Sequence, residues 1–201
     1  MNEYYTTPAG RQMPKIVCID GNIGAGKSTT LQQLSKLGYR VFTEELNSWG
    51  WVLNRYYEDS RRWGFTLQLA ILHSMQQQKC TMDALSDSIV FIERSPASGL
   101  VFAKSCLNQK FLTLEEYNLI ERYYNLIGWQ PSVTYLIDTP AAVCLERIKT
   151  RNRICEQEVK LHYLLTVESF YREQIMPTAT VVDGSSNAAD MAQMVLMNLT
   201  T

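Results

Sequence analysis

Three glycines, a lysine and two hydroxyl residues crowd together in residues 18–29, CIDGNIGAGKST. Four positions match the pattern G-x-x-x-x-G-K-[ST]: Gly21, Gly26, Lys27 and Ser28. Glycines let backbone amides converge on phosphate oxygens, and a following helix adds the positive end of its dipole. The lysine can reach the outer phosphates of a nucleoside triphosphate, and the hydroxyl can bind Mg²⁺. The stretch predicts a phosphate loop made of Gly21, Asn22, Ile23, Gly24, Ala25, Gly26, Lys27, Ser28 and Thr29.

The phosphate loop does not say which group receives the phosphate. A small-molecule kinase is one hypothesis, and a GTPase-like switch or mechanical ATPase is the other. A GTPase of this length should carry N-K-x-D after a late strand, but the apolar run VTYLID is followed by TPAAV. Acids follow another apolar run in TEELNSW (43–49), and basic residues with acids close behind form ERIKTRNRICEQE (146–158). These features favour the kinase, and Glu93 at the end of a third run is compatible with metal binding.

Short apolar runs alternate with long helical patterns, as in a parallel sheet with helices on both faces. Nearly continuous apolar runs are typical of strands that are covered on both sides. We therefore expect a single α/β domain, a three-layer sandwich with a five-stranded parallel sheet. The predicted strands are 15–20, 39–44, 88–93, 133–138 and 179–183. The predicted helices are 27–37, 48–57, 62–85, 97–109, 113–128, 140–151, 157–175 and 188–199, with a capping box of Thr113 and Glu116.

The composition excludes several classes of protein. A net charge of −1 gives no general basic field for nucleic acid or a membrane surface, and no apolar run is long enough for a membrane span. The five cysteines show no metal spacing, and the two histidines are too scattered for a metal site. Residues 1–14 read as a flexible tail, without the apolar core of a signal peptide. We expect a cytoplasmic protein that binds neither nucleic acid nor membrane.

The chain resembles the deoxynucleoside kinase family, which includes deoxycytidine, deoxyguanosine and mitochondrial-type thymidine kinases. The resemblance is carried over nearly the whole chain by GNIGAGKST, TEELNSW, DSRRWGFTLQ, ERS and ERIKTRNR. It implies a basic lid at about 149–157 and Mg²⁺-assisted transfer of the γ-phosphate of ATP to the 5′-hydroxyl of a deoxyribonucleoside. The alternative is a nucleoside monophosphate kinase of the thymidylate kinase type, although that family usually carries D-R-[YH] where this chain has ERS.

The resemblance assigns catalytic roles, each with a simpler alternative. Glu44 corresponds to the general base, although Glu45 next to it leaves the pattern alone ambiguous. Arg94 would hold the region of the 5′-oxygen, and Glu93 would assist Ser28 with Mg²⁺; alternatively, Glu93 and Arg94 are an ion pair that caps the next helix. The lid residues Lys149, Arg151 and Arg153 would place two charges on the phosphates, or they would only compensate the dipole at the end of a helix.

The resemblance also assigns the binding of the nucleoside. Gln68 would read the edge of the base, while Tyr57 and Glu156 would bind the 3′-hydroxyl. The rest of the cleft would be lined by Trp49, Leu67, Ile71, Met75 and Gly99, which without the resemblance are more simply core residues. The stacking aromatic of the family falls on Ala103, with Phe102 adjacent, and that choice stays open. The family is usually dimeric, which implies a homodimer formed through 97–109 and 113–128.

Overall fold

In the computed structural model, the described residues are 13–153, 156 and 159–199. They form a five-stranded parallel sheet in the order β2-β3-β1-β4-β5. The strands are β1 (Lys15–Asp20), β2 (Arg40–Phe42), β3 (Ile89–Glu93), β4 (Val133–Asp138) and β5 (Thr180–Asp183). The predicted α/β architecture is confirmed. Of the predicted tail, only Met13 and Pro14 are among the described residues.

The eight helices of the described residues follow the predicted ones closely. They are α1 (Lys27–Lys36), α2 (Leu46–Glu58), α3 (Ser60–Asp83), α4 (Pro96–Asn108), α5 (Leu114–Ile127), α6 (Ala141–Arg151), α7 (Leu161–Gln174) and α8 (Ala188–Leu199). The capping box of Thr113 and Glu116 is present at the start of α5. The predicted start of a helix at 157 is wrong for Val159 and Lys160, which precede α7 and are not helical.

Strand β2 is shorter than predicted at both ends: Tyr39 is not part of it, and the predicted last two residues leave the sheet. The backbone carbonyl of Thr43 accepts a hydrogen bond of 2.8 Å from Nε2 of Gln78 on α3 instead of joining the ladder. The next residue, Glu44, then turns into a cavity at the carboxyl ends of the strands. The departure from the sheet therefore delivers an acidic side chain to the site.

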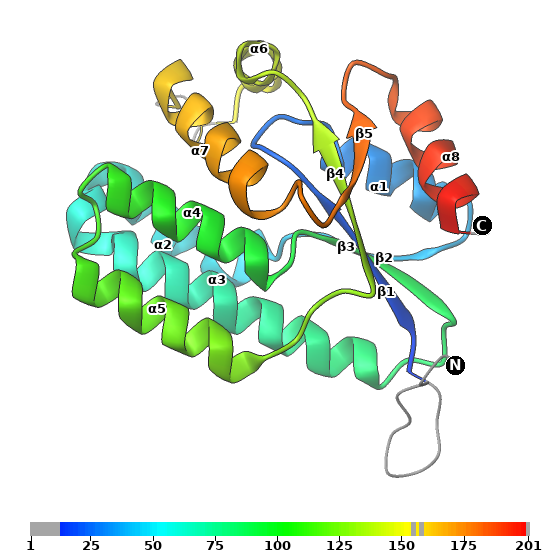
Figure 1. Ribbon diagram of the computed structural model, residues 1–201, viewed down its shortest axis with the longest axis horizontal. Helices are drawn as coiled ribbons and strands as arrows, with labels where there is room; N and C mark the ends of the chain where they lie inside the picture. The colour runs from blue at the N-terminus through cyan, green and yellow to red at the C-terminus, as the bar shows by residue number, and fades with distance from the viewer. Residues whose placement is uncertain (1–12, 154–155, 157–158, 200–201) are drawn as a thin grey trace.

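Alternation along each strand divides the core between the two faces of the sheet, since successive side chains point to opposite sides. On β1, Val17 and Ile19 pack with residues of α1 and α8. Ile16 and Cys18 pack on the other face with residues of α3. Figure 1 shows this arrangement, with α1 and α8 on one side of the sheet and α3, α4 and α7 on the other.

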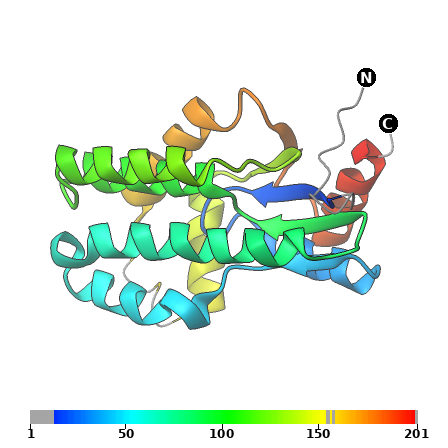
Figure 2. The ribbon, with the colours of Figure 1, turned by 90° about the horizontal axis from the view of Figure 1, so that it is seen from below.

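Helices α2 to α5 lie side by side and form a helical layer beyond one face of the sheet (Figures 1 and 2). A second core cluster fills this layer without any strand residue, and it includes Trp49, Tyr56, Leu67, Leu72 and Ile120. Several of these residues belong to the predicted nucleoside cleft. The layer is therefore both a core and one wall of the site.

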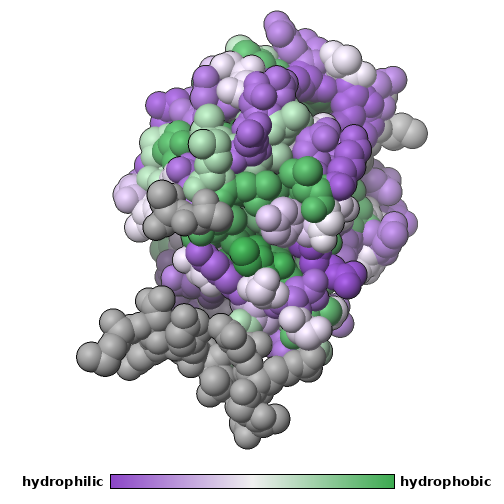
Figure 3. Space-filling view, turned by 90° about the vertical axis from the view of Figure 1, so that its right-hand side faces the viewer, coloured by the Kyte–Doolittle hydropathy of each residue, from purple (hydrophilic) through white to green (hydrophobic). Residues whose placement is uncertain are grey.

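The side of the molecule that carries α8 shows hydrophobic side chains gathered in the middle of its surface (Figure 3). Met194 and Met197 of α8 and Val181 of β5 are exposed apolar residues of these elements. Within the described part of the chain, no helix combines the length and the apolar character needed to cross a membrane.

Candidate active site

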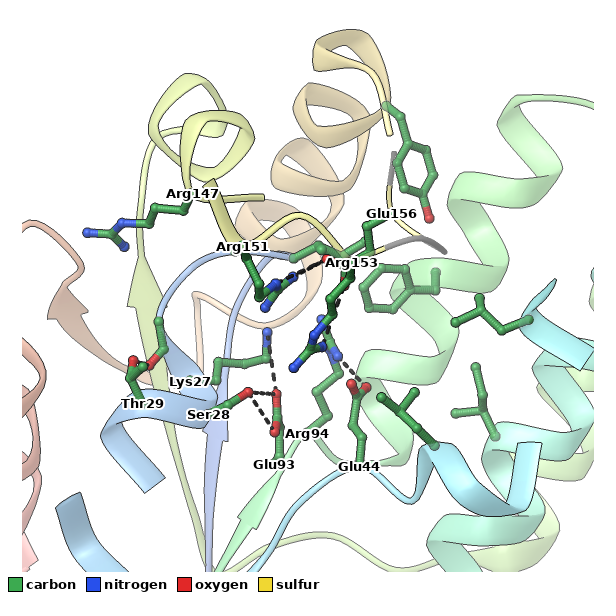
Figure 4. Close-up of a pocket in the computed structure, with 18 of the residues that line it drawn as sticks. Lys27, Ser28, Thr29, Glu44, Glu93, Arg94, Arg147, Arg151, Arg153 and Glu156 are labelled. Atoms are coloured by element: carbon green, nitrogen blue, oxygen red, sulfur yellow. Dashed lines mark hydrogen bonds and ion pairs between the residues drawn. The ribbon is translucent and has the colours of Figure 1, made fainter. Parts of the chain in front are cut away.

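A cavity of about 860 Å³ lies at the carboxyl ends of the strands. This is where parallel sheets of this kind bind ligands, because the loops that leave neighbouring strands meet there. Its walls come from the phosphate loop, the end of β3, the residues after β2 and β3, helices α2, α3, α4 and α6, and the starts of α7 and α8. Figure 4 shows its charged centre.

The phosphate loop wraps the start of α1. Gly24 and Gly26 have φ angles of +80° and +111°, in the region that L side chains rarely adopt. A Cβ on Gly24 would also stand 2.6 Å from the carbonyl oxygen of Cys144. The backbone therefore needs glycine here, and it brings the amino end of α1 to the cavity.

The structure separates the predicted phosphate-binding residues into two sets. The cavity is lined by Ile23, Gly24, Gly26, Lys27, Ser28 and Thr29, whereas Gly21, Asn22 and Ala25 do not line it. The Asn22 side chain donates to the backbone carbonyl of Leu164 at 2.9 Å. The carbonyl of Ala25 accepts hydrogen bonds from Thr139 and Arg147. These residues shape the loop from behind.

Lys27 is a buried cation at the base of the loop, with 4% of its side chain exposed. Its ammonium group donates to the carbonyl of Asn22 at 2.8 Å and lies 3.9 Å from a carboxylate oxygen of Glu93. Burial and the nearby charge of Arg94 lower its pKa to about 8, despite the opposing effect of Glu93. Because burial disfavours the charged ammonium group, an anionic ligand such as a phosphate would stabilise it.

Ser28 and Glu93 form an oxygen pair next to Lys27. The Ser28 hydroxyl lies 3.1 Å from each carboxylate oxygen of Glu93. Hydroxyl and carboxylate oxygens are the hard ligands that Mg²⁺ prefers, and this ion usually takes its other ligands from phosphates and water. No group of three or more His, Cys, Asp or Glu in the described residues could hold a metal ion by itself. The pair therefore fits an ion that arrives with a nucleotide.

The alternative in which Glu93 caps the following helix does not match the geometry. Helix α4 is capped by Ser95 and Ser98 in a reciprocal capping box, and Pro96 occupies its first turn. Glu93 instead faces Ser28 and Lys27 across the cavity (Figure 4).

Glu44, not Glu45, points into the cavity. Arg94 donates from Nη1 to Oε1 of Glu44, whereas Glu45 accepts from the Ser74 hydroxyl of α3 at 3.3 Å. Burial acts to raise the pKa of Glu44, but the charges of Arg94 and Lys27 outweigh it, so the pKa lies below its ordinary value. Glu44 is therefore an ionised carboxylate, which can accept a proton.

The Glu44–Arg94 pair has a central position in the cavity. Figure 4 shows it between Lys27 of the phosphate loop and the helices α2 and α4 of the helical layer. The Glu44 carboxylate would thus lie between a group bound against those helices and phosphates bound at the phosphate loop.

Gln68 of α3 is the buried amide of the cavity wall, and only 3% of it is exposed. Its Nε2 makes a long contact of 3.7 Å with the sulfur of Cys106, and its Oε1 has no hydrogen-bond partner in the described residues. Buried polar atoms are nearly always partnered. The unpartnered Oε1 can therefore accept a hydrogen bond from a ligand bound in the cavity.

The apolar side chains predicted around Gln68 all line the cavity: Trp49, Leu67, Ile71, Met75 and Gly99. Phe102 also lines it, whereas Ala103 is fully buried in the core. Of the two candidates left open for the aromatic position, Phe102 is thus the one that borders the cavity. Tyr57 lines the cavity together with its neighbour Tyr56, whose hydroxyl contacts the Cys106 sulfur at 3.6 Å.

Two of the three predicted lid cations reach the cavity. Arg151 and Arg153 line it, and Lys149 does not. Both arginines form ion pairs with Glu156, which also lines the cavity. Positions 154–155 and 157 of the predicted lid lie outside the described residues.

The residues at the far end of the cavity were not predicted from the sequence. Arg147 donates to the carbonyls of Ala25 and Gly184, and so joins the phosphate loop to the loop after β5. That loop contributes Ser186, Asn187 and Ala188 to the lining, and α8 contributes Met191. Two signals were available: Arg147 precedes Arg151 by one helical turn, and β5 ends at the same edge of the sheet as the other strands.

Comparison with known proteins identifies the family. A family model of deoxynucleoside kinases matches residues 17–199. A relative from Frog virus 3 is 29% identical over 157 residues, which cover 78% of this chain and 80% of that protein. The deoxyguanosine kinase of Dictyostelium discoideum is 32% identical over 178 residues, covering 84% of this chain and 61% of that protein.

A solved structure shows the same fold. The deoxyadenosine kinase of M. mycoides, solved with dCMP and dCDP bound, superimposes with a TM-score of 0.82 at 24% identity. The match covers 92% of this chain and 98% of that one. The match to the family model spans nearly the whole chain, including every strand but the start of β1, so this chain belongs to the deoxynucleoside kinase family, a family of phosphotransferases.

Proposed function

We propose that this protein transfers the γ-phosphate of ATP to the 5′-hydroxyl of a deoxyribonucleoside. The observation that carries the proposal is the position of Glu44, an ionised carboxylate paired with Arg94, between the phosphate loop and the apolar wall of one cavity. A phosphate donor and an alcohol acceptor bound at the two ends of this cavity would meet at that carboxylate.

The donor end holds the triphosphate. Backbone amides of the phosphate loop and the positive end of α1 bind the phosphate oxygens, and Lys27 neutralises their charge. Ser28 and Glu93 hold the Mg²⁺ ion, which supplies charge neutralisation on the phosphates when bound. The nucleoside of ATP extends toward Arg147 and Asn187, which line that end of the cavity.

The acceptor end holds the deoxyribonucleoside. Gln68 pairs with the base edge, because an amide offers an acceptor and a donor side by side, and Phe102 and the apolar side chains enclose the ring. Tyr57 and Glu156 bind the 3′-hydroxyl. Glu156 also holds the lid arginines, so binding of the sugar and placement of the lid depend on the same carboxylate.

The chemical step uses the central pair. Glu44 accepts the proton of the 5′-hydroxyl as its oxygen attacks the γ-phosphorus, and Arg94 orients the carboxylate and the oxygen. The bond from the γ-phosphorus to the β–γ bridging oxygen breaks at the same time, and ADP leaves. Arg151 and Arg153 stabilise the charge on the transferring group. Closure of the lid over about 149–157 excludes water and so limits hydrolysis of ATP.

A phosphorylation assay tests the proposal. The purified protein is incubated with Mg-ATP and each of the four deoxyribonucleosides, with ribonucleosides and thymidylate as controls, and the products are separated by chromatography. Formation of deoxyribonucleoside 5′-monophosphate supports the proposal. Transfer to thymidylate alone would assign the protein to the nucleoside monophosphate kinases instead.

We also propose that the protein is a homodimer built on α4 and α5. Leu100 and Leu107 of α4 and Tyr117 of α5 pack against the core of the helical layer, so they do not form an exposed apolar stripe. The exposed apolar residues of α5 are Leu114, Leu119 and Leu126. Sedimentation equilibrium of the wild type and of Leu126→Lys tests this face, since the variant should be monomeric.

A further inference from the structure

The carboxylate of Asp20 is a buried junction that none of the roles above uses. Asp20 ends β1, is 0% exposed and does not line the cavity. It accepts hydrogen bonds from the backbone amide of Gly21 at 2.8 Å, from the Tyr171 hydroxyl at 2.8 Å and from the Ser98 hydroxyl. One carboxylate therefore ties the phosphate loop to α4 and α7.

Arg94, close to this junction, has an unusual backbone. Its φ angle is +63°, a left-handed conformation that is strained for a residue with a side chain. Such a conformation persists only where the surroundings hold it in place. Arg94 is 7% exposed, and its Nε has no hydrogen-bond partner in the described residues. The Arg94 side chain donates to Glu44, and the Tyr171 hydroxyl also interacts with it directly.

The face of the same guanidinium rests on a ring that Tyr171 supports. The central carbon of the Arg94 guanidinium lies 4.8 Å from the centroid of the Phe102 ring. Phe102 in turn packs edge-on against Tyr171, with the centroids 6.2 Å apart. Tyr171 is 3% exposed, so its ring has little freedom to move. The chain of contacts runs from Asp20 through Tyr171 and Phe102 to Arg94.

Tyr171 is a reliable donor in this chain of contacts. Burial raises the pKa of its hydroxyl well above its ordinary value, and the Asp20 carboxylate raises it further against the opposing effect of Arg94. The hydroxyl is therefore protonated over the whole working range. Its helix, α7, is also the first element after the lid.

We propose that Tyr171, anchored on Asp20, is a positioning residue that fixes Arg94 against Glu44. This inference rests on the proposed function, because it concerns the orientation of the pair assigned to the chemical step. The anchor determines where the Phe102 ring stands, and the ring determines where the guanidinium lies. Because Tyr171 belongs to α7, the position of Arg94 depends on the position of α7. This helix is the first element after the lid.

The test removes the hydroxyl and keeps the ring. Tyr171→Phe should lower kcat for the preferred deoxyribonucleoside by about tenfold, as a loss of transition-state positioning. The KM for ATP should change by less than about twofold, since the groups of the phosphate loop that line the cavity stay in place. Tyr135→Phe is the matched control, because Tyr135 is a buried tyrosine of β4 that does not line the cavity. Its kcat should equal that of the wild type.

A double-mutant cycle separates positioning from simple loss of stability. If Tyr171 acts through Arg94, Tyr171→Phe should have almost no further effect on kcat in an Arg94→Lys background. Multiplicative effects of the two changes, or a drop in melting temperature with unchanged kcat, would overturn the inference. Ser98→Ala, which removes another donor to Asp20, gives a second readout if Tyr171→Phe folds poorly; unchanged kcat there would count against the anchor.

The outcomes distinguish this inference from the proposed function. Wild-type protein that phosphorylates deoxyribonucleosides, with kcat insensitive to Tyr171→Phe, overturns the anchor and leaves the proposed function intact. Wild-type protein that phosphorylates none of them overturns the proposed function itself.

Discussion

Replacement of Gln68 by leucine should change stability and activity in opposite directions. The wild-type amide is 3% exposed and leaves its Oε1 unpartnered in the described residues. A buried acceptor without a partner costs about 1–3 kcal/mol, and removing it recovers part of that cost. With about 1 kcal/mol recovered, the melting temperature of the ligand-free protein should rise by about 2–4 °C for a chain of this size. The weak contact of Nε2 with Cys106, at 3.7 Å, subtracts little from this gain.

Activity should fall because the bound base loses both hydrogen bonds and its polar edge is left buried without partners. The two terms together amount to about 2–4 kcal/mol, which lowers kcat/KM for the nucleoside by about 30- to 1,000-fold. The assays are steady-state kinetics with the preferred nucleoside and calorimetry without it. Gln77→Leu is the control, since Gln77 is an exposed glutamine of the same helix and should leave kcat/KM unchanged. A lower melting temperature together with an unchanged kcat/KM would refute the reasoning.

Two further predictions concern the charged centre. Ser28→Ala should raise the Mg²⁺ concentration for half-maximal activity by about tenfold. Ser35→Ala, at an exposed position of α1, is the control and should leave that concentration unchanged. Equal responses of both variants to Mg²⁺ would exclude Ser28 as a ligand. Since Arg94 holds the pKa of Glu44 below its ordinary value, kcat/KM should show no acid limb above about pH 5, and the stability given by the pair should be lost only as the pH falls through that lowered pKa. An acid limb of kcat/KM near neutral pH would contradict this prediction.

The sheet and the phosphate loop could be predicted because their causes are local. The strand residues Val17, Ile19, Phe91 and Tyr135 are each at most 1% exposed, so the strands read as apolar runs in the sequence. The glycines of the phosphate loop are required by backbone angles, which few other residues adopt. Patterns that arise from local geometry or from complete burial are visible in one sequence.

Other features depend on where the chain turns, and a single residue decides them. Glu44 and Glu45 have the same side chain, and only the exit of the chain after β2 puts the first into the cavity and the second against Ser74. Phe102 and Ala103 differ by about 100° around α4, so the helical phase decided which one borders the cavity. Local pattern does not fix either choice.

Contacts between distant segments could not be predicted from pattern. Tyr171 bonds to Asp20 across 151 positions of the chain, and Arg147 reaches Gly184 through the fold. Nothing in the sequence distinguished Tyr171, and the spacing of Arg147 from Arg151 indicates a shared helix face but not the contact with Gly184. Their roles become visible only in the folded structure, which shows the buried polar groups to which they donate hydrogen bonds.

The most direct test of the central claim is the single-turnover rate of Glu44→Gln with Mg-ATP and the preferred deoxyribonucleoside. The change keeps the size of the side chain and removes its ability to accept a proton. We predict a rate lower by about 10²-fold or more, with the dissociation constant for ATP unchanged. A rate close to that of the wild type would show that Glu44 is not the base, and the proposed mechanism would be wrong.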